Sequence, residues 1–248
     1  MAIESGYRMI DTAEAYGNEK EVGEGIRQSG IDRRELFLVT KVNFKSYEHA
    51  EQTVLQSLAD LQTDYLDLLL LHWPFANYYA AWRVLEKLYA DGKVRAIGVS
   101  NFEPDQLLDL IAYHKIVPAV DQIGNYRILP GFCIFLVEQQ IGIGGVGPAG
   151  LAHQSLQSIC ILPGIGHIPQ KHIVAVIRPA QVLLRFLTQK GIAVIPRSTQ
   201  PEHIKENFDL FDFALTAEEL ARLSALDRKE PLIGKAETPE LVEFSLTW

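Results

Sequence analysis

The chain contains very little cysteine and no long apolar run. Cys133 and Cys160 are its only cysteines, too few for a disulfide framework or a cysteine-rich metal site, and a reducing compartment suits them. No stretch reads as a signal peptide or a transmembrane helix. We therefore expect a cytoplasmic protein with no membrane partner and no bound metal.

Positive charge is also scarce. The sequence has 23 Lys and Arg against 31 Asp and Glu, which gives a net charge of −8 at pH 7. Because nucleic-acid binding requires clustered Lys and Arg, a nucleic acid is not an expected partner. With 248 residues, 48% of them hydrophobic, the chain fits a single domain over residues 1–248. We expect a monomer that acts on a small molecule.

One long segment lacks acidic residues altogether. Neither Asp nor Glu occurs between Gln139 and Pro201, where average composition predicts about eight. From about residue 124 to about residue 178, the sequence also shows no clear strand or helix pattern and is rich in Gly, Ile, Pro and Gln. The glycines of 142–147 match G-x-G-x-x-G, the fingerprint of doubly wound dinucleotide-binding folds. That motif needs a following helix and an acid about 20 residues on, whereas Pro148 follows here and the next acid is Glu202. We interpret the match as an accident of composition.

Three short hydrophobic runs near the start of the chain end in residues that handle protons. Residues 8–10 lead into Asp11, with Tyr16 just beyond, residues 36–40 lead into Lys41, and residues 66–71 lead into His72. If these runs are parallel strands, their C-terminal ends share one edge of a sheet, where the four side chains would form an acid–base site. The alternatives are a helix cap for Asp11, a solvated charge for Lys41 and a core histidine for His72.

Further strand-like runs alternate with amphipathic helical stretches, which is typical of a parallel sheet covered by helices. We expect strands at 94–99, 118–120 and 192–195. We expect helices at 48–62, 79–91, 104–113, 180–189 and 201–207, and one that starts at a capping box, Thr216 to Glu219, and reaches Leu226.

Polar residues at three of these strand ends suit a cofactor. Ser100, Asn101 and Gln122 offer a hydroxyl and two amides, which can bond a carboxamide such as that of nicotinamide. Arg197 and Ser198 precede a helix N-terminus, where a guanidinium and free backbone N–H groups can hold a phosphate. Taken alone, these would be ordinary polar loop residues.

Several segments, in their order and spacing, resemble the aldo-keto reductases, the (β/α)8 TIM-barrel family that reduces carbonyls with NADPH. The resemblance covers about residues 1–123 and 179–248 and is closest to the bacterial branch acting on small dicarbonyls and keto-sugars. The matching segments are Gly6 to Glu19, Val39-Thr40-Lys41, Leu71-His72-Trp73-Pro74, Ile97 to Phe102 and Ile195-Pro196-Arg197-Ser198.

The resemblance implies a role for each candidate residue. Tyr16 would be the general acid, Lys41 and Asp11 would lower its pKa from an unperturbed value of about 10, and His72 would orient the carbonyl. The expected cofactor ligands are Ser100, Asn101, Gln122, Arg197 and Ser198, with Glu206 and Asn207 near the adenine. Trp73 would line the substrate pocket. His203 stands where the family often has Arg, which leaves the strength of the NADP preference open.

Two departures from the family pattern suggest a damaged barrel. A first barrel strand normally precedes the segment that starts here at Met1, so we expect the barrel to be incomplete. The family's later strand, roughly Glu-Ala-Trp-x-Pro-Leu, is missing from the middle segment. Codons for residues 138–150, read one nucleotide later, permit Asn-Asn-Lys-Leu-Val-Leu-Glu-Ala-Trp-Ala-Pro-Leu. Our hypothesis is that residues from about 124 to about 178 are translated out of frame.

The sequence therefore leaves three functions open. The first is an NADPH-dependent reductase of aldehydes or ketones. The second is a catalytically dead fragment of the same family, which keeps the site residues on a broken scaffold. The third is a nucleotide-binding module that does not turn over substrate.

Overall fold

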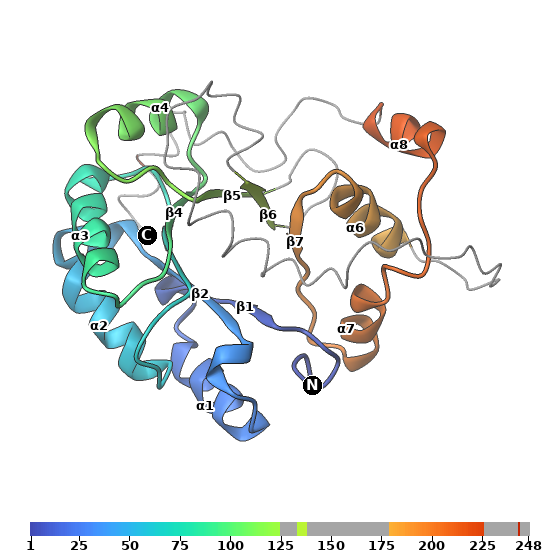
Figure 1. Ribbon diagram of the computed structural model, residues 1–248, viewed down its shortest axis with the longest axis horizontal. Coiled ribbons are helices and arrows are strands. Elements are labelled where there is room, and N and C mark those ends of the chain that lie inside the picture. Colours follow the sequence, from blue (N-terminus) through green and yellow to red (C-terminus); the bar gives the residue numbers. More distant parts are fainter. Residues whose placement is uncertain (125–132, 138–178, 226–242, 244–248) are drawn as a thin grey trace. The chain divides into compact units, whose positions relative to one another are not determined.

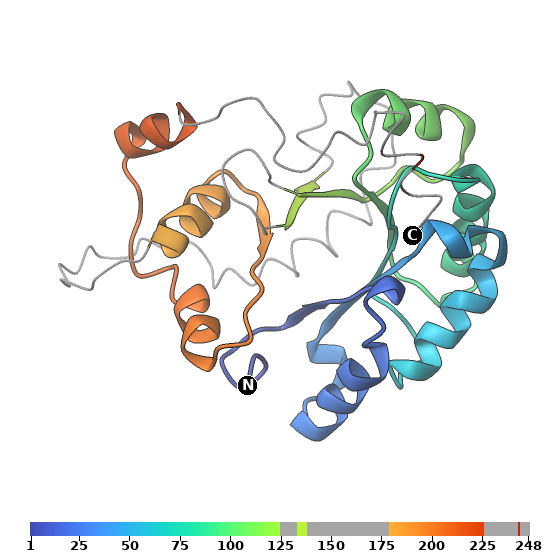
Figure 2. The same ribbon diagram turned by 180° about the vertical axis from the view of Figure 1, so that it is seen from behind.

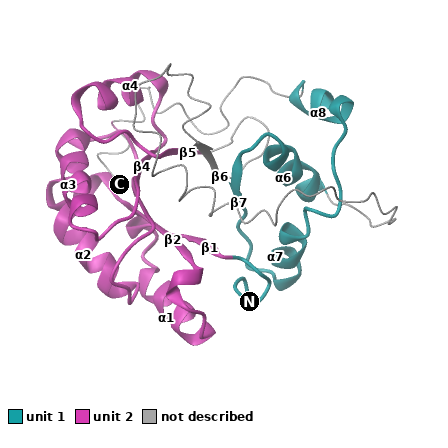
Figure 3. Cartoon of the chain, viewed as in Figure 1, with its two compact units in different colours: residues 1–7, 124–135, 160–233 teal, residues 8–123, 136–159, 234–248 magenta. Residues whose placement is uncertain are grey.

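A computed structural model describes residues 1–124, 133–137, 179–225 and 243. By its contacts the chain divides into two compact units (Figure 3). Unit 1 comprises residues 1–7, 124–135 and 160–233, and unit 2 comprises residues 8–123, 136–159 and 234–248. A single domain over residues 1–248 stays a prediction.

Unit 2 is built on parallel strands that alternate with helices, as the sequence predicts. Its strands are β1 (Met9–Asp11), β2 (Phe37–Val42), β3 (Leu68–Leu71), β4 (Ile97–Ser100) and β5 (Val120–Gly124). Each strand pairs in parallel with the next along the chain, with Asp11 opposite Val39, Lys41 opposite Leu70 and Ser100 opposite Gln122. Their C-terminal ends therefore meet at one edge.

The helices of unit 2 lie on the outer side of these strands in both views (Figure 1 and Figure 2). They are α1 (Glu19–Ser29), α2 (Ala50–Asp60), α3 (Tyr78–Ala90) and α4 (Pro104–Tyr113), with short 3-10 helices η1 (Glu14–Tyr16), η2 (Arg33–Glu35) and η3 (Phe44–His49). All four residues of β3 and of β4 are buried. Strands covered on both faces are expected to be continuous apolar runs, which is what made them recognisable in the sequence.

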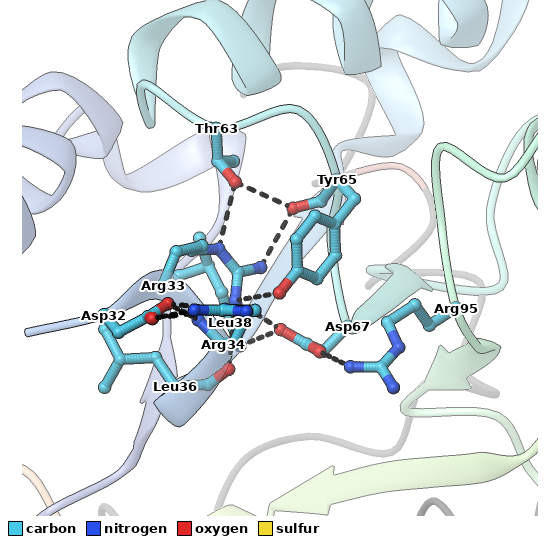
Figure 4. A network of polar contacts seen from close by, with 9 residues as sticks. All are labelled: Asp32, Arg33, Arg34, Leu36, Leu38, Thr63, Tyr65, Asp67 and Arg95. Carbon is cyan, nitrogen blue, oxygen red and sulfur yellow. Dashed lines mark hydrogen bonds and ion pairs between the residues drawn. The ribbon is translucent and has the colours of Figure 1, made fainter.

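A buried carboxylate forms hydrogen bonds and ion pairs at the N-terminal ends of β2 and β3 (Figure 4). Asp67, just before β3, accepts the backbone N–H of Leu38 at 3.0 Å and pairs with Arg33 at 2.8 Å and with Arg95 at 3.0 Å. The guanidinium of Arg33 also lies 4.1 Å from the centre of the Tyr65 ring. Because the strand ends that carry Asp11 and His72 are at the other edge, we regard this cluster as structural.

Unit 1 contains a two-stranded antiparallel ladder and three helices among its described residues. Its elements are β6 (Cys133–Val137), β7 (Ala193–Ile195), α6 (Pro179–Gln189), α7 (Pro201–Phe208) and α8 (Ala217–Ser224), with Cys133 opposite Ile195 in the ladder. Thr216 and Glu219 form the predicted capping box of α8. Strand β6 falls in the segment from about residue 124 to about residue 178, where the sequence predicted no regular element. The G-x-G-x-x-G match of 142–147 lies outside the described residues.

No helix within the described ranges combines the length and the apolar character needed to cross a bilayer.

Candidate active site

An ion pair at the C-terminal edge of the sheet forms the centre of the site. Lys41 Nζ donates to Asp11 Oδ1 at 2.6 Å and to the backbone oxygen of Thr12 at 2.9 Å. The two charged side chains are only 1% and 7% exposed. Gln122 Nε2 donates to the other Asp11 oxygen at 3.0 Å. A buried pair needs such additional hydrogen bonds to offset its desolvation, so Asp11 and Lys41 are fixed relative to three strands.

Tyr16 and His72 lie beside this pair. Tyr16 belongs to η1, the short turn directly after β1, and its ring centre is 5.2 Å from Lys41 Nζ. The His72 ring stands edge-on to the Tyr16 ring, with centres 5.7 Å apart. Tyr16 is 51% exposed, so a ligand can reach its phenol. The four residues predicted as an acid–base site are thus brought together.

His72 is held in its neutral form. Burial, together with the nearby positive charge of Lys41, lowers its pKa from 6.5 to about 3. A neutral imidazole carries one N–H donor and one acceptor. It can therefore donate a hydrogen bond to a ligand oxygen at neutral pH without carrying charge.

Ser100, Asn101 and Gln122 also form one group, as predicted. Ser100 Oγ and the backbone N–H of Asn101 both donate to the Gln122 backbone oxygen, at 2.7 and 3.0 Å. Asn101 Nδ2 donates to the His72 backbone oxygen at 3.0 Å. Asn101 has a left-handed backbone with φ of 61°, which Asn tolerates better than most residues. Both amide nitrogens are used as donors, Asn101 Nδ2 to His72 and Ser100 and Gln122 Nε2 to Asp11, which leaves the amide oxygens as the acceptors of these side chains.

The other predicted cofactor ligands belong to unit 1. Arg197 is exposed and Ser198 half-buried, between β7 and α7, and Ser198 Oγ accepts the backbone N–H of Gln200 at 3.0 Å. Glu206 and Asn207 lie in the last turn of α7, and the Glu206 backbone oxygen accepts from Gln181 Nε2 at 3.0 Å.

Trp73, the predicted substrate residue, follows His72 directly. Its ring stacks on Phe75 at 5.6 Å with the planes 6° apart. Tyr47, which the sequence analysis did not single out, contacts the Trp73 backbone through its hydroxyl. Only the tertiary structure shows this contact, since the two residues are 26 positions apart.

Comparison with known proteins agrees with this geometry. The profile of the Aldo/keto reductase family matches residues 1–157 and 172–228, further into the middle segment than the sequence resemblance reached. The chain belongs to the aldo/keto reductase family. It is an oxidoreductase of a family that reduces carbonyl compounds with a nicotinamide cofactor.

Two relatives of this aldo/keto reductase illustrate the similarity. It is 42% identical to morphine 6-dehydrogenase of Pseudomonas putida, with 98% of this chain and 87% of the relative aligned. It is 41% identical to glyoxal reductase of Bacillus subtilis, with 92% and 82% aligned.

Solved structures confirm the predicted α/β fold of the (β/α)8 barrel class. An aldo-keto reductase from a Medee basin deep-sea metagenome library gives a TM-score of 0.73 at 32% identity, over 96% of this chain and 88% of that one. A Bombyx mori aldo-keto reductase in complex with NADP gives 0.70 at 30% identity, over 94% and 82%.

Proposed function

We propose that this aldo/keto reductase reduces small aldehydes or ketones with NADPH and that Tyr16 donates the proton. The observation that carries the proposal is the buried Asp11–Lys41 pair, with Lys41 Nζ 5.2 Å from the centre of the exposed Tyr16 ring. A positive charge beside a phenol stabilises the phenolate, which makes the phenol a better acid. Asp11 keeps the Lys41 ammonium in place, and Gln122 keeps Asp11 in place.

His72 is proposed to orient the substrate. With its pKa lowered to about 3, the ring is neutral throughout the physiological range and can donate an N–H to the carbonyl oxygen. Since Tyr16 and His72 lie side by side, one oxygen atom can accept a hydrogen bond from both. The oxygen is then held where Tyr16 can protonate it as negative charge develops.

The polar groups at the strand ends fit a nicotinamide. The amide oxygens of Asn101 and Gln122 can accept from a carboxamide N–H₂, and the Ser100 hydroxyl lies next to them. When bound, the reduced cofactor supplies the hydride. For NADPH rather than NADH, we propose that Arg197 and Ser198 hold the 2′-phosphate, with Glu206 and Asn207 at the adenine. The NADP complex of the Bombyx mori relative supports this choice.

Small dicarbonyls are the proposed substrates, in line with the bacterial glyoxal reductase among the relatives. Trp73, beside His72, is the proposed pocket wall. We further propose a cytoplasmic monomer that does not bind nucleic acid.

A tyrosine variant tests the proton donor. Tyr16→Phe should abolish reduction of methylglyoxal, because only the donor is removed, while the Kd of NADPH stays nearly unchanged. The measurements are NADPH oxidation and a fluorescence titration of NADPH, with NADH titrated in parallel. Tyr113→Phe, which alters an exposed tyrosine of α4, is the control. A Tyr16→Phe variant that keeps most of its kcat would refute the assignment.

A second candidate function is nucleotide binding without turnover. It is favoured by the acid-free segment of residues 139–201, which overlaps the stretch from about 124 to about 178 that we propose to be out of frame. In that case the unaltered protein binds NADPH in the same titration but oxidises none with any carbonyl compound.

A further inference from the structure

A single buried hydroxyl holds the backbone of the proposed substrate-pocket residue. The Tyr47 hydroxyl donates to the Trp73 backbone oxygen at 2.7 Å and accepts the Trp73 backbone N–H at 3.2 Å. Tyr47 is 2% exposed. Burial raises the pKa of its phenol far above the ordinary value, so the hydroxyl keeps the proton that it needs to donate. Both polar backbone groups of Trp73 are thus satisfied by one side chain.

The neighbouring residue is fixed just as completely. The His72 backbone N–H donates to the Val42 backbone oxygen at 3.1 Å, and its backbone oxygen accepts from Asn101 Nδ2 at 3.0 Å. His72 and Trp73 together have four polar backbone groups. One forms a hydrogen bond with β2, one with Asn101 in the turn after β4, and two with the Tyr47 hydroxyl. Removing the Tyr47 hydroxyl would take away the partner of both Trp73 groups at a part-buried position, which costs free energy.

The segment that carries Tyr47 is also joined to the turn that carries Tyr16. The Glu14 carboxylate in η1 accepts the backbone N–H of Asn43 at 2.8 Å and the hydroxyl of Ser46 at 2.5 Å. Residues 43–47 therefore contact the Tyr16 turn on one side and the His72–Trp73 backbone on the other. This segment therefore links the two parts of the site, in addition to the strand pairing through β2.

We propose that Tyr47 is a positioning residue, whose hydroxyl sets the place of Trp73 and His72 relative to Tyr16. This inference rests on the proposed function, because it assigns Tyr47 to the same carbonyl reduction. Tyr47 does not touch the reacting atoms. The simpler reading is that its ring merely fills the core, and the two readings differ in what the hydroxyl alone contributes.

Tyr47→Phe in the full chain separates the readings, since it keeps the ring and removes the hydroxyl. Misplacement of reacting groups by about 1 Å costs up to about a hundredfold in rate, so we expect kcat/KM for methylglyoxal to fall between about tenfold and a hundredfold. The Kd of NADPH should change less than about twofold, because no proposed cofactor ligand is altered. Hydrogen exchange of the Trp73 amide should be at least about tenfold faster, since its acceptor is gone.

Tyr65→Phe is the matched control. It removes a phenol from the opposite end of β3, where the hydroxyl lies 3.4 Å from Arg33, and it should leave kcat/KM and Trp73 exchange unchanged. Ser46→Ala is a milder variant of the same segment and should give a smaller loss in the same direction.

An active parent with unchanged kcat/KM in folded Tyr47→Phe would overturn the inference. If Tyr47→Phe does not fold, an unchanged kcat/KM in Ser46→Ala would overturn it instead. A parent that reduces no carbonyl compound would contradict the proposed function, and the exchange measurement would then decide alone: faster Trp73 exchange supports the positioning role of Tyr47, and unchanged exchange overturns it.

Discussion

Asp121 and Gln122 are consecutive residues of β5, and their side chains lie on opposite faces of the strand. Side chains alternate along a strand, and Gln122 donates to Asp11 in the site. Asp121 is buried, and its Oδ1 finds no hydrogen-bond partner among the described residues. Its pKa is raised from 3.8 to about 7 because burial outweighs a backbone hydrogen bond from Phe102 that lowers the pKa, and nearby Glu103 adds to the rise.

This carboxyl predicts a stability that falls as the pH rises. The pKa of Asp121 is higher in the folded protein than the value of about 3.9 in an unfolded chain, so the folded state binds the proton more tightly. Its contribution is fully present below about pH 4 and is lost as the pH rises through about 7.

Asp121→Asn removes this titration while keeping the shape of the side chain. As the pH rises from about 5 to about 8, we expect the stability of the variant to increase relative to the parent by at most about 3 kcal/mol, because about two pH units of this window lie below the folded pKa, at about 1.4 kcal/mol per unit. Thermal melts of both proteins over this range measure the difference. A difference in Tm that does not change with pH would contradict the prediction. His72, whose lowered pKa favours the folded state at higher pH, cancels in the comparison.

At the residue scale, the sequence predicted which of the candidate residues come together but not the contacts that hold them there. Asp11, Lys41 and His72 were recognisable because each ends an apolar run. The partners that fix them were not recognisable, because their contacts join distant positions: Gln122 and Asp11 are 111 residues apart. Tyr47 lies just before the predicted helix of residues 48–62 and was not singled out, and Asp67 was one residue of the predicted run 66–71.

At the scale of elements, prediction succeeded where local chemistry sets the boundaries. Helix α4 has the predicted bounds, Pro104 to Tyr113, because proline is favoured at the first helical turn. Helix α8 begins at the predicted capping box. Helix α1, which was not predicted, contains Gly23 and Gly25, and glycine lowers helix propensity.

These two glycines provide a test of helix packing. A Cβ on Gly23 would lie 2.5 Å from the Asp60 backbone oxygen and 2.7 Å from the Leu61 backbone carbon, whereas a Cβ on Gly25 would have no atom within 4 Å among the described residues. We therefore expect Gly23→Ala to force α1 away from the end of α2 and to destabilise the protein by about 1–3 kcal/mol.

Gly25→Ala lies in the same helix and should act in the opposite direction. Because alanine is the better helix former, it should stabilise the protein by about 0.5–1 kcal/mol. Urea unfolding of the two variants and the parent measures both effects. Equal stabilities for the two variants would show that the close approach of α1 to residues 60–61 is wrong.

At the scale of the whole molecule, residues 158–171 are the part of the middle segment that the family profile leaves unmatched. If residues from about 124 to about 178 are out of frame, Ile141 to Gly145 replace side chains that should fill a barrel interior, and losses of this kind are large against a net stability of about 5–15 kcal/mol. We expect a version with the shifted frame restored to melt at a higher temperature and to turn over methylglyoxal faster than the chain as written.

The coding DNA provides an independent test of the frameshift hypothesis. Codons for residues 138–150 that do not spell the shifted peptide would remove the basis of the hypothesis. A cooperative melt and equal turnover from the chain as written would contradict the predicted instability.

The order of the proposed active-site residues along the chain has a consequence for biosynthesis. Asp11, Tyr16, Lys41, His72 and Gln122 make their mutual contacts within residues 11–122, all in unit 2. A nascent chain grows by about 5–20 residues per second, and its N-terminal parts fold first. The ribosome can therefore complete the proposed acid–base group several seconds before it has made Arg197. A nascent chain can then hold the proposed proton donor before it contains the residue proposed to bind the cofactor phosphate.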